Sequence, residues 1–153
     1  MLALLRPDSW DFPLFLHVLG AVVLFGAVAS VALLTIASLG REPVAAALLR
    51  RVAFTTMLVA VWPAYVLMRV GAQWILSKEY PGDLPDWAAV GLGISDAGIL
   101  VLALLTLFTW LGYRGTRPEQ PRPRSATVAA GLAALYLVAL GVAWFAMTAK
   151  PGA

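Results

Sequence analysis

The sequence predicts an all-α membrane protein, a bundle of four transmembrane helices. Of the 153 residues, 61% are hydrophobic and only 12% are charged, whereas charged residues make up about a quarter of a typical soluble domain. Four apolar segments are each long enough to cross the hydrocarbon core of a bilayer. They leave no stretch for a separate soluble domain. We therefore expect residues 1–153 to form a single integral membrane domain.

The apolar segments have recognisable ends. We place the transmembrane helices at about residues 12–39, 52–76, 94–113 and 126–148. Asp11 can cap the first helix, and Gly40 ends it. We expect residues 44–51 to lie along the membrane surface and the glycine-rich residues 87–93 to form an interfacial turn. Pro63 lacks a backbone donor, which predicts a kink within the second helix, with the freed carbonyl near Val59 satisfied by a neighbouring helix or a hydroxyl.

The basic residues gather on one side of the predicted bundle. The connections after the first and third helices hold Arg41, Arg50, Arg51, Arg114, Arg117, Arg122 and Arg124, whereas the other side holds Arg6, Lys78 and Lys150. By the positive-inside rule, both chain ends lie outside, an N-out and C-out topology in a bacterial cytoplasmic membrane. The pI near 9.7 therefore reflects topology, and we expect no nucleic-acid partner.

Several functional classes are excluded by what the chain lacks. It contains no cysteine, which rules out disulfides, thiolate metal sites and cysteine nucleophiles. It shows no nucleotide-binding motif and no acid and base pair of the kind that soluble hydrolases use. We assign no catalytic residue and no metal ligand, and nothing in the sequence identifies an enzyme.

Three ionisable residues fall within the predicted spans: His17, Arg69 and Asp96. A charge inside a bilayer is costly, so each marks a candidate functional site. Counted at about 1.5 Å per residue from the basic ends of their helices, all three fall in the outer part of the membrane, with His17 outermost. Arg69 and Asp96 reach similar depths on consecutive helices, which predicts a bidentate ion pair. Such a pair could lock two helices together, and Arg69 could alternatively snorkel to the interface.

His17 admits both a structural and a ligand role. A neutral imidazole can be held by a carboxylate, a backbone carbonyl or a water. It could also be an axial ligand of a haem b, with Met147 at a similar depth as the second ligand. Because the chain has no other histidine, a haem would otherwise need His17 alone or a histidine from another subunit. A quinone near His17 is a further possibility.

Small residues recur at a spacing that suits close helix contacts. The pairs are Gly26 with Ser30, Gly93 with Ala97, and Ala130 with Ala134. Small side chains four residues apart let helix backbones approach within a membrane. We therefore expect these pairs to lie at helix interfaces.

The segment Phe15-Leu-His-Val-Leu-Gly-Ala-Val-Val-Leu-Phe-Gly-Ala, which contains His17, resembles the first helix of a group of small bacterial four-helix membrane proteins. The group includes the copper-resistance-protein-D-like family and a related family of uncharacterised membrane proteins. The shared pattern is Leu-His followed by small residues and a glycine. Some similar proteins, such as the membrane protoporphyrinogen-oxidase type, are linked to haem chemistry through a histidine in this helix.

The sequence favours a small non-catalytic accessory or binding subunit. Its expected surroundings are the lipid bilayer and a larger membrane protein complex, or further copies of itself. Little loop mass and many small residues in the helices support this interpretation. The alternative is a membrane redox protein linked to haem b or quinone that uses His17.

Overall fold

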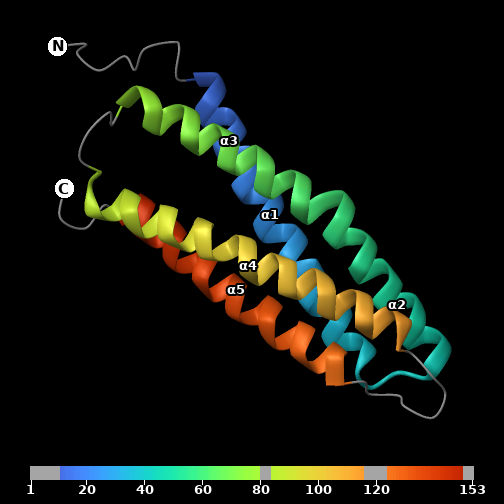
Figure 1. Ribbon diagram of the computed structural model, residues 1–153. Helices are drawn as coiled ribbons and strands as arrows, with labels where there is room; N and C mark the ends of the chain where they lie inside the picture. Colours follow the sequence, from blue (N-terminus) through green and yellow to red (C-terminus); the bar gives the residue numbers. More distant parts are fainter. Residues whose placement is uncertain (1–10, 80–83, 116–123, 150–153) are drawn as a thin grey trace.

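The computed structural model describes residues 11–79, 84–115 and 124–149. Its elements are α1 (Asp11–Ser38), α2 (Pro43–Thr56), the π-helical turn η2 (Met57–Val61), α3 (Trp62–Glu79), α4 (Asp86–Arg114) and α5 (Arg124–Ala149). The second, third and fourth of these follow one another without a break and form one continuous rod (Figure 1). Arg6, Arg117, Arg122 and Lys150, which entered the topology prediction, lie outside the described residues.

The predicted fold class is confirmed. The described residues form four helical rods, each long and apolar enough to cross a membrane. Their outward faces carry large apolar side chains such as Leu33, Leu100 and Val138. In water such a surface would be unstable, whereas in lipid it is the ordinary exterior of a membrane protein.

The second and third rods begin earlier than the sequence suggested. Residues 44–51 belong to α2, and residues 87–93 belong to α4. Pro43 stands at the first turn of α2, where its missing donor costs nothing, and the alanines that follow favour helix. In α4, Gly91 is buried against the methyl group of Met147 on α5. The glycine is therefore a packing position within the helix, and no interfacial turn forms.

The turn before Pro63 is irregular, and the kink expected there stays a prediction. The turn directly before it, η2, is π-helical, and the backbone N–H of Trp62 donates to the carbonyl of Met57, five residues earlier. A π-turn adds a residue to the helix and so rearranges the hydrogen bonds near a proline. The helix continues through this point, and Tyr65 and Arg69 follow in regular α3.

The bundle consists of two closely packed helix pairs. α3 packs along α1, and α5 packs along α4. α1 also contacts α5, and α2 contacts α4, whereas the backbones of α3 and α4 hardly approach each other. Figure 1 shows the ribbons of α3 and α4 diverging away from the α2 end. Polar side chains join these two helices where the backbones do not.

Two ends of the bundle can be named by their charges. The basic end holds the end of α1, the start of α2, the end of α4 and the start of α5, with their arginines (Figure 1). The acidic end holds the start of α1, the end of α3 and the start of α4, with Asp11, Glu79 and Asp86.

Single glycines produce the closest helix contact. A Cβ at Gly20 of α1 would collide with the backbone of Met68 on α3, and one at Gly71 of α3 would collide with the backbone of His17. The pairs expected from spacing are not at such contacts: a Cβ at Gly26 or Gly93 would meet nothing within 4 Å. Ser30, Ala97 and Ala134 are likewise exposed, whereas Ala130 is buried. Spacing shows that two small residues share a face, but it does not show which face is covered.

Candidate functional site

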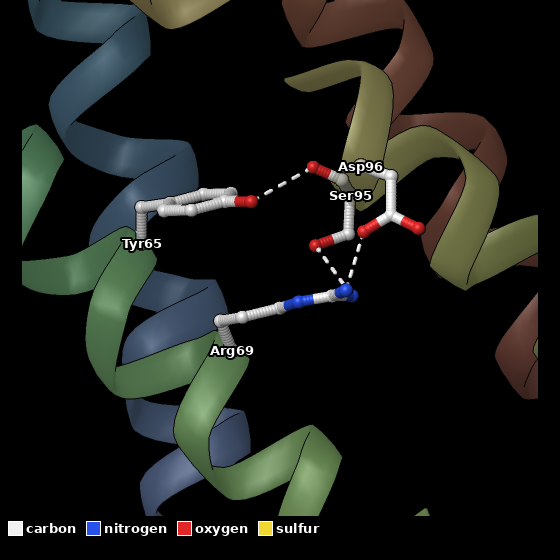
Figure 2. A network of polar contacts seen from close by, with 4 residues as sticks. All are labelled: Tyr65, Arg69, Ser95 and Asp96. Atoms are coloured by element: carbon white, nitrogen blue, oxygen red, sulfur yellow. Dashed lines mark hydrogen bonds and ion pairs between the residues drawn. The ribbon is translucent and has the colours of Figure 1, made fainter. Parts of the chain in front are cut away.

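The structure joins α3 to α4 through four polar residues (Figure 2). Nη2 of Arg69 forms an ion pair with Oδ1 of Asp96. Nη1 of Arg69 donates to the hydroxyl of Ser95 at 3.4 Å. The hydroxyl of Tyr65 donates to the main-chain oxygen of Ser95 at 2.9 Å. We call these four residues the seam network.

The helices position the seam network by simple periodicity. Tyr65 and Arg69 are four residues apart on α3, so both side chains project from the same face toward α4. Ser95 and Asp96 are consecutive on α4, so a single guanidinium reaches both. The sequence suggested a bidentate ion pair on one carboxylate, and the structure does not show one. One nitrogen contacts the carboxylate and the other contacts the neighbouring hydroxyl.

The seam network is unevenly covered. Tyr65 is buried, the side chain of Arg69 is 23% exposed, and that of Asp96 is 60% exposed. Arg69 and Asp96 each lie ten residues from the acidic end of their helix, about 15 Å along its axis. The hydrocarbon core of a bilayer is about 30 Å thick, so this level falls within the length of helix that would cross it. The ion pair with Arg69 offsets only part of the free-energy cost of placing the Asp96 carboxylate at this level in a membrane.

His17 is held by a main-chain hydrogen bond. Its Nδ1 atom lies 3.0 Å from the carbonyl oxygen of Met68 on α3, and the side chain is half-buried. A carbonyl only accepts, so Nδ1 carries the proton, and Nε2 of the neutral ring keeps a lone pair. Among the partners that the sequence allowed, the backbone carbonyl is the one that the structure brings to His17.

His17 lies close to the level of Arg69 and slightly nearer the acidic end. It contacts the backbone of Met68, the residue before Arg69, and lies against Gly71, two residues after Arg69. The expected difference in depth between His17 and Arg69 was too large because it was counted from Arg41 and Arg51, as if these two arginines were level. The contact between Ser38 and Arg50 is the true level marker at the basic end. His17 lies 21 residues from Ser38 along α1, and Gly71 lies 21 residues from Arg50 along the second rod.

His17 and Met147 contact different helices. The methyl group of Met147 occupies the space that a side chain at Gly91 of α4 would fill, whereas His17 lies against α3. The close contacts at Gly20 and Gly71 leave no room for a porphyrin between α1 and α3. A haem ligated by His17 would therefore have to approach Nε2 from outside this interface. Ligation of haem by His17 and Met147 stays a prediction.

Tyr136 on α5 holds a buried hydroxyl beside the seam network. The residue is 2% exposed, and its hydroxyl has no hydrogen-bond partner among the described residues. The hydroxyl lies where a Cβ of Gly98 would be, at 2.6 Å from that position. Two tyrosines, from α3 and α5, thus converge on one turn of α4.

Arg50 is a buried cation that sequence reasoning missed as a site residue. It is 2% exposed, its Nε donates to the hydroxyl of Ser38 at 3.1 Å, and its Nη2 donates to the main-chain oxygen of Ser38 at 3.4 Å. Ser38 is the last residue of α1, where carbonyls lack helical partners and the helix dipole favours a cation. Arg50 therefore caps α1 from the neighbouring helix. Its predicted position in a surface segment concealed this role.

The chemistry of the seam network is recognition through hydrogen bonds and charge. Within residues 11–79, 84–115 and 124–149, no three histidine, aspartate or glutamate side chains group so as to hold a metal ion. The network offers an exposed carboxylate, a guanidinium, a serine hydroxyl and one phenol at one depth. These groups suit contact with a polar group on a partner inside the membrane.

Comparison with known proteins identifies no family. No family model matches the chain, and no curated protein or solved structure matches it significantly. The resemblance of the His17 segment to small four-helix membrane proteins therefore remains a resemblance in one motif, supported by the four-helix fold.

Proposed function

We propose that this protein is a small accessory subunit of a larger bacterial membrane complex. It docks through the surface at which α3 and α4 meet in the acidic half of the bundle. The observation that carries the proposal is the 60% exposure of the Asp96 side chain at membrane depth. A partner helix that donates a hydrogen bond or a cation to this carboxylate would remove its contact with lipid. The contact would then be both specific and favourable.

We favour a protein partner over a purely structural role for the ion pair because the Asp96 carboxylate is incompletely paired. Arg69 divides its donors between Asp96 and Ser95, so one guanidinium does not saturate the carboxylate. An ionised carboxylate has about four acceptor sites. Lipid tails offer no donor, whereas a second membrane protein can supply one. The proposed orientation places the basic end in the cytoplasm, by the positive-inside rule.

Site-specific photo-crosslinking in native membranes tests the proposal. A photoreactive residue replaces Gln73, on the same face of α3 as Arg69, or Leu100, on the same face of α4 as Asp96. The matched control is Val138 on α5, which is as exposed as Leu100. We expect one distinct membrane protein to be captured from positions 73 and 100 but not from 138. Capture of lipid alone, or of a second copy of this chain alone, would refute the proposal.

The orientation has its own test, because the chain contains no cysteine. Single cysteines at Glu42 and Lys78, both exposed and at opposite ends of the second rod, report each side separately. An impermeant maleimide applied to cells with a permeable outer envelope should label Lys78→Cys and spare Glu42→Cys until the inner membrane is opened. The reverse pattern would overturn the N-out assignment.

One observation favours a redox protein as a second candidate. Metal-bound histidines usually donate their other ring nitrogen to a carbonyl or carboxylate, and His17 makes this bond to Met68. Nε2 would then be the ligating or hydrogen-bonding atom toward a haem or quinone. A Soret band in the purified native complex, lost on replacing His17, would support this candidate. A colourless, fully active complex would exclude its haem form.

A further inference from the structure

The basic end of the bundle presents a surface of exposed arginines. Arg41 lies between α1 and α2, Arg51 lies within α2, and Arg114 and Arg124 lie at the end of α4 and the start of α5; all four are exposed. Glu42 is the one carboxylate that the described residues place at this end. Arg50 contributes no surface charge because it is buried against Ser38. The exposed charge is therefore strongly positive where the bundle leaves the membrane.

Two of these arginines lie beside the contact between α2 and α4. The rings of Phe54 on α2 and Tyr113 on α4 are stacked, with centroids 6.2 Å apart and planes 9° from parallel. Arg51 precedes Phe54 by one helical turn, and Arg114 follows Tyr113 directly. Because the two helices are antiparallel, both arginines lie beyond the ring pair toward the basic end. The two arginines therefore lie at the same end of the ring pair, one on each helix.

Arg114 is oriented by a third ring. Its guanidinium lies over the ring of Trp110, 4.8 Å from the centroid. Stacking of this kind uses the flat face of the guanidinium and leaves its N–H edge able to donate to an anion. A planar edge with several donors suits the oxygens of a phosphate. Arg51, with no aromatic ring over it among the described contacts, supplies a second cation.

Apolar surface continues below the ring pair, toward the centre of the membrane. Leu107 lies seven residues from Arg114 and Leu58 lies seven residues from Arg51, so each shares a helix face with its arginine. Both leucines are nearly half exposed, at 45% and 48%. A ligand here would meet two cations first, then aromatic rings and then aliphatic surface. This order matches the head group, glycerol region and acyl chains of a phospholipid.

We propose that the contact between α2 and α4 at the basic end binds one anionic phospholipid, with its phosphate between Arg51 and Arg114. Basic sites between transmembrane helices hold anionic head groups in this way. The apolar surface below the arginines favours a lipid over free phosphate. The site is at the opposite end from the seam network and is independent of the proposed docking function.

Native mass spectrometry of the purified protein in detergent measures the binding directly. The probes are phosphatidylglycerol, phosphatidylcholine and inorganic phosphate, each added separately. We expect retained adducts of phosphatidylglycerol, few of phosphatidylcholine, and no displacement of lipid by inorganic phosphate. Each arginine near a membrane surface contributes about fivefold to binding of an anionic lipid. The double variant Arg51→Gln with Arg114→Gln should therefore lose phosphatidylglycerol affinity by well over tenfold.

The matched control removes the same charge elsewhere on the basic end, through Arg41→Gln with Arg124→Gln. Affinity close to that of the native chain in this control is the expected result. Equal losses in both double variants would show only a diffuse surface potential and would overturn the site. A third variant, Arg51→Lys with Arg114→Lys, guards against misfolding because it keeps both charges. It should bind phosphatidylglycerol more tightly than the double glutamine variant, whereas equal loss in a folded lysine variant would show that the guanidinium edges, and not charge alone, hold the phosphate.

Discussion

The Nδ1 atom of His17 donates to the main-chain oxygen of Met68 across 3.0 Å. This bond ties a side chain of α1 to the backbone of α3 at the point where Gly20 and Gly71 allow the two helices to touch. The bond uses only one nitrogen of the imidazole ring, so the two nitrogens of His17 can have different roles. Nδ1 has a structural role, whereas Nε2 is the atom that a ligand would use.

Replacement of His17 by two different residues distinguishes these roles. The amide nitrogen of asparagine stands in for Nδ1, so His17→Asn should keep the bond to Met68, whereas His17→Ala should lose about 1 kcal/mol of unfolding free energy. Reversible unfolding in detergent measures both. If Nε2 binds a ligand, His17→Asn should be as stable as the native protein but defective in the native complex. A fully functional His17→Asn protein would rule out a ligand role.

The Arg69 and Asp96 pair should behave as a coupled unit. Either residue alone leaves an uncompensated charge at membrane depth, so Arg69→Met and Asp96→Asn should each destabilise the bundle. The double variant should lose less unfolding free energy than the two single variants lose together. The difference, the coupling energy, should be about 1 kcal/mol or more. A double-mutant cycle on unfolding free energies in detergent gives this coupling. Additive losses would mean that the two side chains do not interact in the membrane.

The contact between Arg69 and Asp96 could be anticipated because a connection of few residues makes their helices neighbours and both lie at similar depth. The role of Arg50 could not, since an arginine beside the exposed Arg51 resembles any other charge at a membrane surface. Only the position of Ser38 on another helix reveals it as a cap. The difference in depth between His17 and Arg69 was overestimated, because residue counts along separate helices have no common origin until a contact supplies one.

The helix contacts illustrate the same limit. Single glycines, at positions 20 and 71, make the closest approach, whereas the pair of Gly26 and Ser30 is exposed. A pattern within one helix describes its faces but carries no information about which face a neighbour covers. The four rods were predictable because each depends on its own composition. Their mutual rotation depends on residues that are distant in sequence.

The glycine contacts give a prediction with an internal control. Gly20→Ala and Gly71→Ala each introduce a Cβ into the backbone of the facing helix, so α1 and α3 must separate. We expect losses of about 1–3 kcal/mol in unfolding free energy, as for other overpacked interiors. Gly26→Ala and Gly93→Ala add the same methyl group to open positions and should be neutral or slightly stabilising. Thermal unfolding in detergent compares the four variants. Equal effects in all of them would contradict the packing of α1 against α3.

Arg50 should stabilise the bundle through its hydrogen bonds to the end of α1 and not through its charge alone. Arg50→Met removes the donors to Ser38 and leaves its carbonyl without this partner, at a cost of about 1.5–3 kcal/mol. Arg41→Met removes the same charge from an exposed position and should change the unfolding free energy by less than about 0.5 kcal/mol. Chemical denaturation in mixed micelles is the appropriate measurement. Comparable effects of the two replacements would show that the basic end responds only to total charge.

Tyr65 and Tyr136 should respond in opposite directions to loss of a hydroxyl. Tyr65→Phe removes a hydrogen bond to the carbonyl of Ser95 and should cost about 1 kcal/mol. Tyr136→Phe removes a buried hydroxyl that has no partner among the described residues, so the desolvation penalty disappears and stability should rise by about 1 kcal/mol. Because the ring remains in both variants, packing against Gly98 is preserved in the second. Unfolding free energies of the two variants in the same detergent provide the comparison. A destabilised Tyr136→Phe protein would mean that the hydroxyl binds a water or another polar group next to the seam network, and it would make that turn of α4 part of the binding site.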